Sequence, residues 1–265
     1  TYVKESGKSR AQGRILTGGA PVSDAQLVTW RDAFPDTEIQ VVYGSTEAEP
    51  VAHVDAGERL ELDGKGFCAG IPCSLVKTKI IRIEDGALAL GAHGWSDLEL
   101  PVGEIGELVV SGAHICRDYF NNPDAVRANK IVEADGTLWH RMGDTGYFDE
   151  AGRFWLVGRV HSTIFRDGNV HHPQLIEQAA KGNDDRIRRV AVLGVKDAKR
   201  GQLIVVVVRS DDAAVVAAVQ ERLAANGQTA DDVILWKQPF PMDPRHNAKV
   251  DYRALTTQVM DKDER

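Results

Sequence analysis

The stretch Tyr43-Gly44-Ser45-Thr46-Glu47 combines residue types that can bind a ligand. It supplies an aromatic ring, a glycine, two hydroxyls and a carboxylate, and it follows directly after Ile39, Val41 and Val42. These β-branched residues predict a short buried strand, and ligands of open α/β sheets bind at the carboxyl ends of strands. A turn needs only one or two of these residue types, so the sequence predicts a binding loop here.

A second glycine-bearing loop is expected at the same edge of the sheet. Thr17-Gly18-Gly19-Ala20-Pro21 follows a predicted strand at Arg14–Leu16. Ser23 then caps a predicted helix that ends near Ala33, and the predicted strand at Glu38–Val42 comes next. Glycines in such loops let the backbone approach a planar base or a phosphate, where a Cβ would obstruct.

Six motifs follow one another in order along the chain. After these two loops come Gly106-Glu107-Leu108 with Gly112, Gly143-Asp144, Gly158-Arg159 and Asn247-Ala248-Lys249-Val250-Asp251. In this order they resemble the adenylate-forming (AMP-binding) enzyme superfamily, and the resemblance runs from about Arg14 to Leu255. It implies an AMP-forming ligase that uses ATP and Mg²⁺ to convert a carboxylic acid into an acyl-adenylate, with release of pyrophosphate. The expected substrate is a fatty or hydroxy-fatty acid.

The resemblance also assigns roles at the nucleotide. It places Gly18, Gly19 and Ala20 along the adenine and Tyr43 against the face of that ring. Asp144 would accept hydrogen bonds from both ribose hydroxyls, since an ionised carboxylate has acceptors for two donors. The residues that it assigns to ATP or AMP are Gly18, Gly19, Ala20, Tyr43, Gly44, Ser45, Thr46, Asp144 and Arg159.

Three of the residues are implied to be catalytic. Thr46 offers a hydroxyl to phosphate oxygens, and Glu47 would supply an oxygen ligand to magnesium, which takes few carboxylates alongside phosphate. Lys249 would neutralise the charge that builds up when a carboxylate attacks the α-phosphorus. Its loop departs from the family's Gly-Lys-Val-Asp pattern, because Ala248 replaces the glycine.

The pattern of elements predicts a mixture of α/β and α+β architecture in two domains. Residues 1–158 would be the C-terminal part of a large nucleotide-binding domain. A small antiparallel β-barrel subdomain is expected at about 60–115, where short apolar runs alternate with Gly, Pro and Asp. Residues 159–265 would form a small mobile α+β lid domain that carries Lys249, and the resemblance places its hinge at His161.

The chain opens at Thr1 in what reads as an interior segment. The superfamily's Ser/Thr/Gly-rich phosphate loop, which normally lies a hundred residues or more before Thr17, has no counterpart here. We therefore expect the N-terminal half of the same protein to supply that loop and much of the acyl pocket. Residues 1–265 alone are expected to be inactive or nearly so.

Three outcomes of the chemistry stay open at the level of sequence. The acyl group could pass to a thiol of CoA or of a carrier protein. The spellings WHRMGD and RHNAK also resemble bacterial olefin-pathway β-lactone synthetases, which use ATP to close a β-hydroxy acid. A non-catalytic nucleotide-binding remnant is the third alternative, although it would have no need for Glu47, Asp144 and Lys249 together.

The bulk composition excludes other classes of protein. The 265 residues carry a net charge of −7, which argues against general nucleic-acid binding. No apolar stretch approaches the roughly 20 residues that span a membrane, and the N-terminus lacks the apolar core of a signal peptide. A cytoplasmic location is the resulting expectation.

Overall fold

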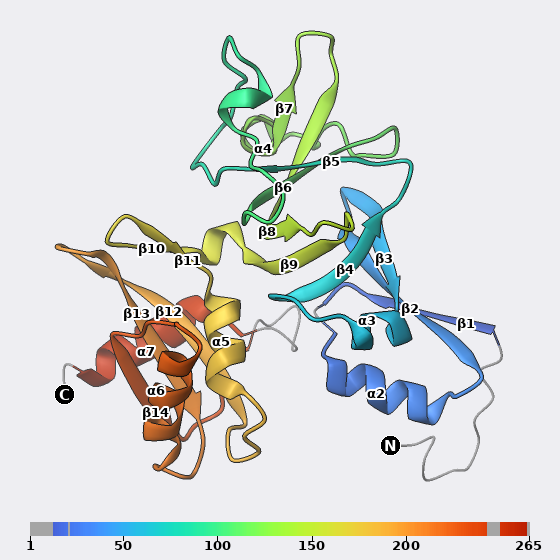
Figure 1. The fold of residues 1–265 in the computed structure, drawn as a ribbon. Coiled ribbons are helices and arrows are strands. Elements are labelled where there is room, and N and C mark those ends of the chain that lie inside the picture. Colours follow the sequence, from blue (N-terminus) through green and yellow to red (C-terminus); the bar gives the residue numbers. More distant parts are fainter. Residues whose placement is uncertain (1–12, 21, 243–249, 264–265) are drawn as a thin grey trace. The chain divides into compact units, whose positions relative to one another are not determined.

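The structure is a computed structural model that describes residues 13–20, 22–242 and 250–263. This part of the chain divides into two compact units between Val160 and His161. Each unit has its own sheet and its own hydrophobic core (Figure 1).

The first unit consists mainly of strands. Its strands are β1 (Gly13–Gly18), β2 (Thr37–Ser45), β3 (Ala48–Asp55), β4 (Phe67–Pro72), β5 (Lys77–Ile81), β6 (Gly106–Ser111), β7 (Lys130–Val132), β8 (Leu138–Phe148) and β9 (Phe154–Arg159). Its helices are α2 (Asp24–Ala33), α3 (Ala56–Glu61), the 3₁₀ turn η1 (Trp95–Asp97) and α4 (Pro123–Asn129). A second 3₁₀ turn, η2 (Val160–Ser162), lies at the division between the units.

Helix α2 begins where the sequence predicts it. The Ser23 hydroxyl accepts a hydrogen bond from the Gln26 backbone N–H, and the Gln26 side chain accepts one from the Ser23 backbone N–H. This reciprocal capping box satisfies backbone donors that the first turn leaves open. Leu27 is fully buried and packs in one cluster with Ile39 and Val41 of β2, which fixes the helix against the sheet.

The β-barrel predicted at about 60–115 is wrong. Strands β4, β5 and β6 belong to a larger open sheet with the order β1-β2-β3-β4-β9-β8-β6-β5, and β7 pairs with β8. Strand β4 pairs with β3 on one side and with β9 on the other. Because both of its edges are occupied by those strands, β4 cannot close a barrel with β5 and β6. Strands β5 and β6 pair with each other within the predicted range, whereas the partners of β4 lie outside it.

The second unit is an α/β sandwich. Its strands are β10 (Ile164–Arg166), β11 (Asn169–His171), β12 (Arg189–Asp197), β13 (Gly201–Arg209) and β14 (Asp232–Trp236). Its helices are α5 (Pro173–Lys181), α6 (Val215–Ala225) and α7 (Tyr252–Asp263). The sheet order is β11-β10-β13-β12, with β14 parallel to β13.

Helices pack on both faces of this sheet, which explains the apolar run of β13. Side chains along a strand point alternately to opposite faces. Val206 and Val208 pack in one cluster with residues of α5 and α6, whereas Val205 and Val207 pack in another with Leu255 of α7. A strand covered on both faces needs apolar residues at every position.

A partly buried carboxyl group connects three elements of the second unit. One oxygen of Glu177 in α5 accepts hydrogen bonds from the Val192 backbone N–H (2.9 Å) and the Tyr252 hydroxyl (2.9 Å). Burial raises the pKa of Glu177 from 4.5 to about 7, against the effect of these hydrogen bonds. The folded state therefore retains this proton at pH values where the unfolded chain has lost it.

We expect this group to make the stability of the second unit depend on pH. A raised carboxyl pKa stabilises the fold fully below the unfolded value, and this stabilisation is lost as the pH rises through about 7. The loss is on the order of 3 kcal/mol. Glu177→Gln should flatten the decrease in unfolding free energy between about pH 4.5 and pH 7, measured by urea denaturation. Glu221→Gln, which changes an exposed carboxylate, is the control. If the unfolding free energy of both variants falls with pH at the same slope, Glu177 is not the cause of the pH dependence.

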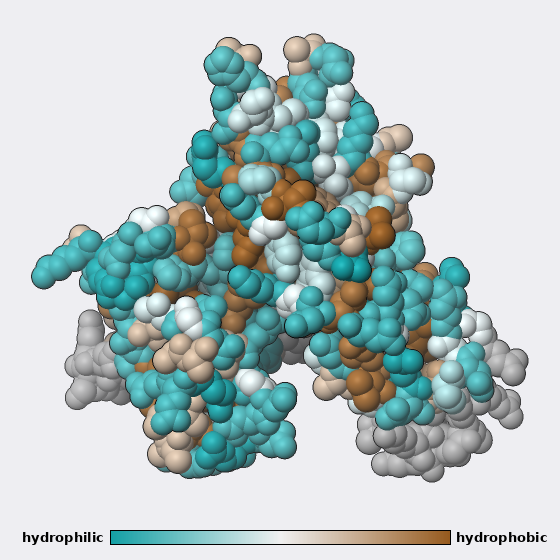
Figure 2. Space-filling model, viewed as in Figure 1, coloured by the Kyte–Doolittle hydropathy of each residue, from teal (hydrophilic) through white to brown (hydrophobic). Residues whose placement is uncertain are grey.

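The surface in Figure 2 is mainly hydrophilic, with smaller hydrophobic patches between the teal regions. Large apolar residues that stay exposed include Leu16, Val28 and Phe120. Within the described ranges, no helix is both long enough and apolar enough to cross a bilayer.

Candidate functional site

Three predicted nucleotide residues form one hydrogen-bonded group in the first unit. Asp144 in β8 and Arg159 in β9 are direct partners across an antiparallel pair. The Tyr43 hydroxyl donates to Asp144 Oδ2 over 2.7 Å, and Arg159 Nη1 lies 2.9 Å from Asp144 Oδ1. Only 8% of the Asp144 side chain is exposed, while 55% of the Arg159 side chain is. The sheet thus holds a buried carboxylate between a phenol and a half-exposed guanidinium.

The electrostatics of this group keep the tyrosine neutral. Burial, followed by the neighbouring Asp144 carboxylate, raises the pKa of Tyr43 well above its usual value. Tyr43 therefore remains a hydrogen-bond donor at neutral pH. Its ring packs against Phe154, with 5.3 Å between the ring centroids. A carboxylate offers about four acceptor positions, so Asp144 can also accept hydrogen bonds from hydroxyl groups of a ligand.

The stretch Tyr43–Glu47 is the tip of a β-hairpin, which differs from the predicted loop. Tyr43, Gly44 and Ser45 are the last residues of β2, and β3 begins at Ala48. The turn is therefore limited to Thr46 and Glu47. A register shift between Tyr43 and Ser45 marks an irregularity in the pairing of β2 with β3. Such bulges redirect side chains and are frequent beside active sites.

The backbone itself requires two of the predicted glycines. A Cβ on Gly44 would lie 2.6 Å from the Ala48 carbonyl oxygen, and one on Gly18 would lie 2.4 Å from that of Val42. Both distances are far below van der Waals contact, so the close approach of neighbouring strands alone explains these glycines. Gly19 is different: its φ is +75°, and a Cβ there would meet no described atom within 4 Å.

The two glycine-bearing segments lie at the same edge of the sheet, as predicted. Strands β1 and β2 are parallel, and Gly18 pairs with Val42, the residue before Tyr43. Gly18, Gly19 and Ala20 are exposed. Pro21 lies outside the described residues. The end of β1 therefore presents accessible backbone beside the start of the hairpin tip.

The hairpin turn carries the polar groups that are predicted to face phosphate. Thr46 is exposed, and Glu47 is partly buried. The Glu47 carbonyl accepts a hydrogen bond from the Cys116 N–H over 2.8 Å. Burial, followed by the charge of the Glu47 carboxylate, raises the pKa of Tyr119 to about 12. Ser45 Oγ is buried and has no hydrogen-bond partner in the described part of the chain. Tyr119 lies outside every sequence motif, so sequence reasoning missed it.

The donor set at the turn fits magnesium bound together with phosphate. The described residues contain no cluster of three or more His, Cys, Asp or Glu side chains that could hold a metal by themselves. Magnesium commonly takes one or two carboxylates and completes its octahedron with phosphate oxygens and water. A single carboxylate at Glu47, beside the Thr46 hydroxyl, matches that requirement.

The roles of two further predicted residues are not tested by this geometry. Lys249 lies outside the described residues, so its assigned role stays a prediction. His161 lies in η2 and is the first residue of the second unit. Its role as a hinge stays a prediction as well.

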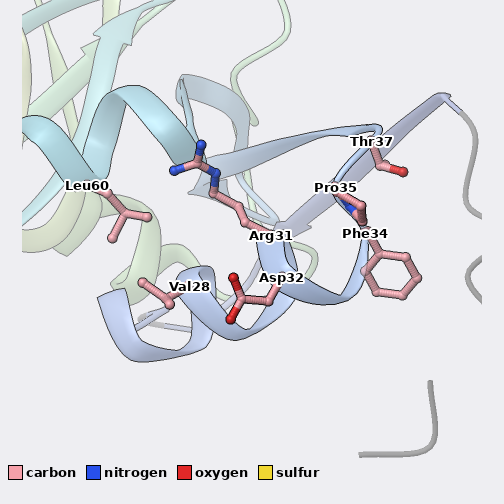
Figure 3. Close-up of a pocket in the computed structure, with 7 residues that line it drawn as sticks. All are labelled: Val28, Arg31, Asp32, Phe34, Pro35, Thr37 and Leu60. Carbon is pink, nitrogen blue, oxygen red and sulfur yellow. The ribbon is translucent and has the colours of Figure 1, made fainter. Parts of the chain in front are cut away.

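A hollow of about 370 Å³ lies at the opposite end of strand β2 from the hairpin tip. It is formed at the C-terminal end of α2, with Thr37 at the start of β2 and Leu60 from α3 (Figure 3). None of its lining residues is a predicted nucleotide residue.

Comparison with known proteins gives the family. Residues 4–120 match the AMP-binding enzyme family. Over 260 residues the chain is 36% identical to an olefin β-lactone synthetase of Stenotrophomonas maltophilia (strain K279a), covering 91% of this chain and 46% of that protein. The olefin β-lactone synthetase of Xanthomonas campestris pv. campestris is 34% identical over 262 residues, with the same coverages. An acyl-CoA ligase of Aspergillus fumigatus is 28% identical over 189 residues, 71% of this chain and 30% of that protein.

Solved structures agree on the fold. The amide bond synthetase of Marinactinospora thermotolerans superposes with a TM-score of 0.69 at 22% identity, covering 92% of this chain and 47% of that one. The o-succinylbenzoate CoA synthetase of Bacillus subtilis, in complex with its acyl-adenylate intermediate, gives 0.68 at 22% identity, with coverages of 91% and 45%.

The fold, the hydrogen-bonded group and these matches define a class of protein: the chain belongs to the adenylate-forming (AMP-binding) enzyme superfamily. Within it, the chain is similar over most of its length to olefin β-lactone synthetases. It spans about half the length of the curated relatives it matches.

Proposed function

We propose that the protein carrying this sequence uses ATP to activate a carboxylic acid as an acyl-adenylate and releases pyrophosphate. The observation that carries the proposal is the Tyr43–Asp144–Arg159 group, a buried carboxylate held ready to accept hydroxyl donors. The strand that supplies Tyr43 also leads into the turn with Thr46 and Glu47. The hairpin thus brings the residues proposed to contact phosphate close to Asp144, the residue proposed to contact the ribose.

The chemistry follows from an in-line displacement at phosphorus. An oxygen of the substrate carboxylate forms a bond to the α-phosphorus while the bond to the pyrophosphate oxygen breaks. Asp144 would orient the ribose, and Thr46 would donate to a phosphate oxygen. Lys249, placed from the sequence, would neutralise the charge that develops on the phosphoryl oxygens. Magnesium held by Glu47 would supply further charge neutralisation when bound.

For the second step we propose closure of a β-lactone from a β-hydroxy fatty acid. The β-hydroxyl oxygen would attack the acyl carbon, the hydroxyl proton would be lost, and AMP would leave with its electron pair. The supporting observation is that the β-lactone synthetases match 91% of the chain at 34–36% identity, whereas the acyl-CoA ligase of A. fumigatus matches 71% at 28%. Transfer of the acyl group to a thiol such as CoA is the second candidate for this step. It is supported by the similarity to the acyl-CoA ligase.

Exchange of pyrophosphate into ATP by the full-length protein tests the first step. We expect exchange that depends on a long-chain acid and that falls at least tenfold in Asp144→Asn, because this change removes the charge that accepts ribose hydroxyls. The exposed Asp185→Asn is the matched control. Absence of acid-dependent exchange with saturated, β-hydroxy and aromatic acids would favour the non-catalytic remnant instead.

Product analysis distinguishes the two candidates for the second step, lactone closure and acyl transfer to a thiol. A β-hydroxy fatty acid with ATP and no thiol should yield a β-lactone and AMP, detected by infrared absorption and mass spectrometry. Formation of an acyl-CoA on addition of CoA, with no lactone in its absence, would select the ligase alternative.

A further inference from the structure

Helices α5 and α7 cover opposite faces of strand β12 in the second unit. Ile176 of α5 packs in one cluster with Val192 of β12, whereas Leu255 of α7 packs in another cluster with Leu193, the next residue of the strand. Neighbouring residues of a strand point to opposite faces. The sheet therefore separates the two helices, and a contact between them has to pass around the edge of β12.

A hydrogen bond joins the two helices at this edge. The hydroxyl of Tyr252, the first residue of α7, donates to Glu177 Oε1 in α5 over 2.9 Å. The same oxygen accepts the backbone N–H of Val192 in β12, also over 2.9 Å. One carboxyl oxygen thus ties the start of α7 to both a helix and a strand.

The residues directly before α7 are held by their backbone. Val250 is buried and forms an antiparallel bridge with Met242. The Asp251 N–H donates to the Pro241 carbonyl over 2.9 Å. These contacts hold the two ends of the segment 243–249 side by side, while the segment itself lies outside the described residues.

Lys249 is joined directly to Val250 in the sequence. Consecutive Cα atoms are about 3.8 Å apart, so the place and direction of the backbone at Val250 limit where the lysine ammonium can reach. A misplacement of about 1 Å caused by a distant substitution can slow a reaction about a hundredfold. The contacts that fix the start of α7 therefore bear on the step in which Lys249 is proposed to act.

We propose that Glu177 and Tyr252 are positioning residues that fix the chain beside Lys249 for the adenylation step. The inference rests on the proposed function, because Lys249 has its role there. Neither Glu177 nor Tyr252 would touch ATP or the acid. They act through the backbone: without their hydrogen bond, the start of α7 loses its connection to α5 and β12.

Hydrogen exchange of the full-length protein tests this connection without any substrate. Tyr252→Phe keeps the ring and removes only the hydroxyl. The backbone amides of residues 250–255 should then exchange about tenfold faster, because local opening depends on the contacts that close a segment. The amides of β13 should exchange as in the wild type. Mass spectrometry of the peptides that cover both regions measures the two rates.

Single-turnover formation of the acyl-adenylate tests the effect on the reaction. Tyr252→Phe and Glu177→Ala should slow this step about fivefold to tenfold, with less than about a twofold change in ATP affinity. Glu177→Gln keeps an acceptor oxygen and should restore most of the rate. In a Lys249→Ala background, Tyr252→Phe should cause no further loss, because residues that act as a unit are not additive.

Two control variants remove comparable groups elsewhere. Glu221→Ala removes an exposed carboxylate of α6, and Tyr147→Phe removes a hydroxyl of the first unit that accepts from the Lys65 N–H. Both should leave the amide exchange of residues 250–255 and the rate of adenylate formation unchanged. Thermal unfolding shows whether each variant folds, and Tyr252→Phe tests the proposal even if Glu177→Ala fails to fold.

The outcomes separate this proposal from the proposed function. Unchanged amide exchange in Tyr252→Phe, an unchanged rate, or a rate loss that adds fully to that of Lys249→Ala would overturn the positioning role alone. A wild-type protein that forms no adenylate from any acid tested would overturn the proposed function. Faster amide exchange in Tyr252→Phe would in that case still retain the connection between α5, β12 and the start of α7.

Discussion

Replacing Lys249 with alanine in the full-length protein should slow acyl-adenylate formation by about a hundredfold to a thousandfold, on the order of 3 kcal/mol of barrier. Attack on the α-phosphorus adds negative charge to oxygens that are already crowded with charge. A lysine ammonium is a compact cation on a flexible stem, and it can neutralise this charge without a proton transfer. Rapid-quench measurement of acyl-adenylate in a single turnover reports this step directly.

The matched control for Lys249→Ala is Lys237→Ala, which removes an exposed lysine of the same unit. ATP affinity, measured by calorimetry without the acid, should change little in either variant, because Lys249 is expected to act on charge that develops only in the transition state. A Lys249→Ala protein that folds, binds ATP and forms the adenylate at the wild-type rate would show that the lysine has no catalytic role.

Local signals in the sequence predicted helix α2 well. It has its predicted Ser23 cap and ends at Ala33, as predicted. A helix closes its hydrogen bonds within a few residues, so capping and periodicity are readable from neighbouring positions. The β-barrel failed for the opposite reason: β4 finds its partner β9 more than eighty residues further along the chain, and no local pattern encodes that choice.

In the candidate site too, the sequence predicted individual residues but not the contacts between residues distant in sequence. The motif order pointed to Tyr43 and Asp144 separately, but their hydrogen bond joins residues 101 positions apart and follows only from the sheet topology. Tyr119, which lies near the Glu47 carboxylate, carries no motif, since a tyrosine in a loop is common on any protein surface. Gly18 and Gly44 were predicted to make room for ATP, whereas the packing of neighbouring strands already requires them.

A buried ion pair stabilises the first unit close to the Tyr43–Asp144–Arg159 group. Glu107 and Arg141 expose 2% and 6% of their side chains, and Glu107 Oε2 accepts from Arg141 Nε (3.0 Å) and Nη2 (2.6 Å). Burial raises the pKa of Glu107, opposed chiefly by Arg141. Glu107 in β6 is the direct partner of Thr145 in β8, the residue after Asp144. The pair therefore lies beside the backbone that presents Asp144, the carboxylate proposed to accept the ribose hydroxyls.

We expect Glu107→Ala to reduce the free energy of unfolding by about 3–5 kcal/mol, because it leaves a buried guanidinium without its counter-charge. Glu107→Gln keeps the shape and one acceptor, so it should cost less. The exposed pair of Arg14 and Glu38 provides a control, and Glu38→Ala should change stability little. Urea denaturation of the full-length protein measures all three.

Removing both partners of this pair should not restore stability. Arg141 also donates to the carbonyls of Glu84, Gly86 and Ala128. A double variant Glu107→Leu, Arg141→Met would therefore leave these carbonyl oxygens without a donor, at a cost of about 1–3 kcal/mol for each one that water cannot reach. If the double variant is as stable as the wild type, Glu107 and Arg141 only neutralise each other's charge, and the hydrogen bonds from Arg141 to the three carbonyls add nothing to stability. A destabilised double variant would instead show that the hydrogen bonds from Arg141 to the carbonyls of Glu84, Gly86 and Ala128 stabilise this unit beyond the ion pair itself.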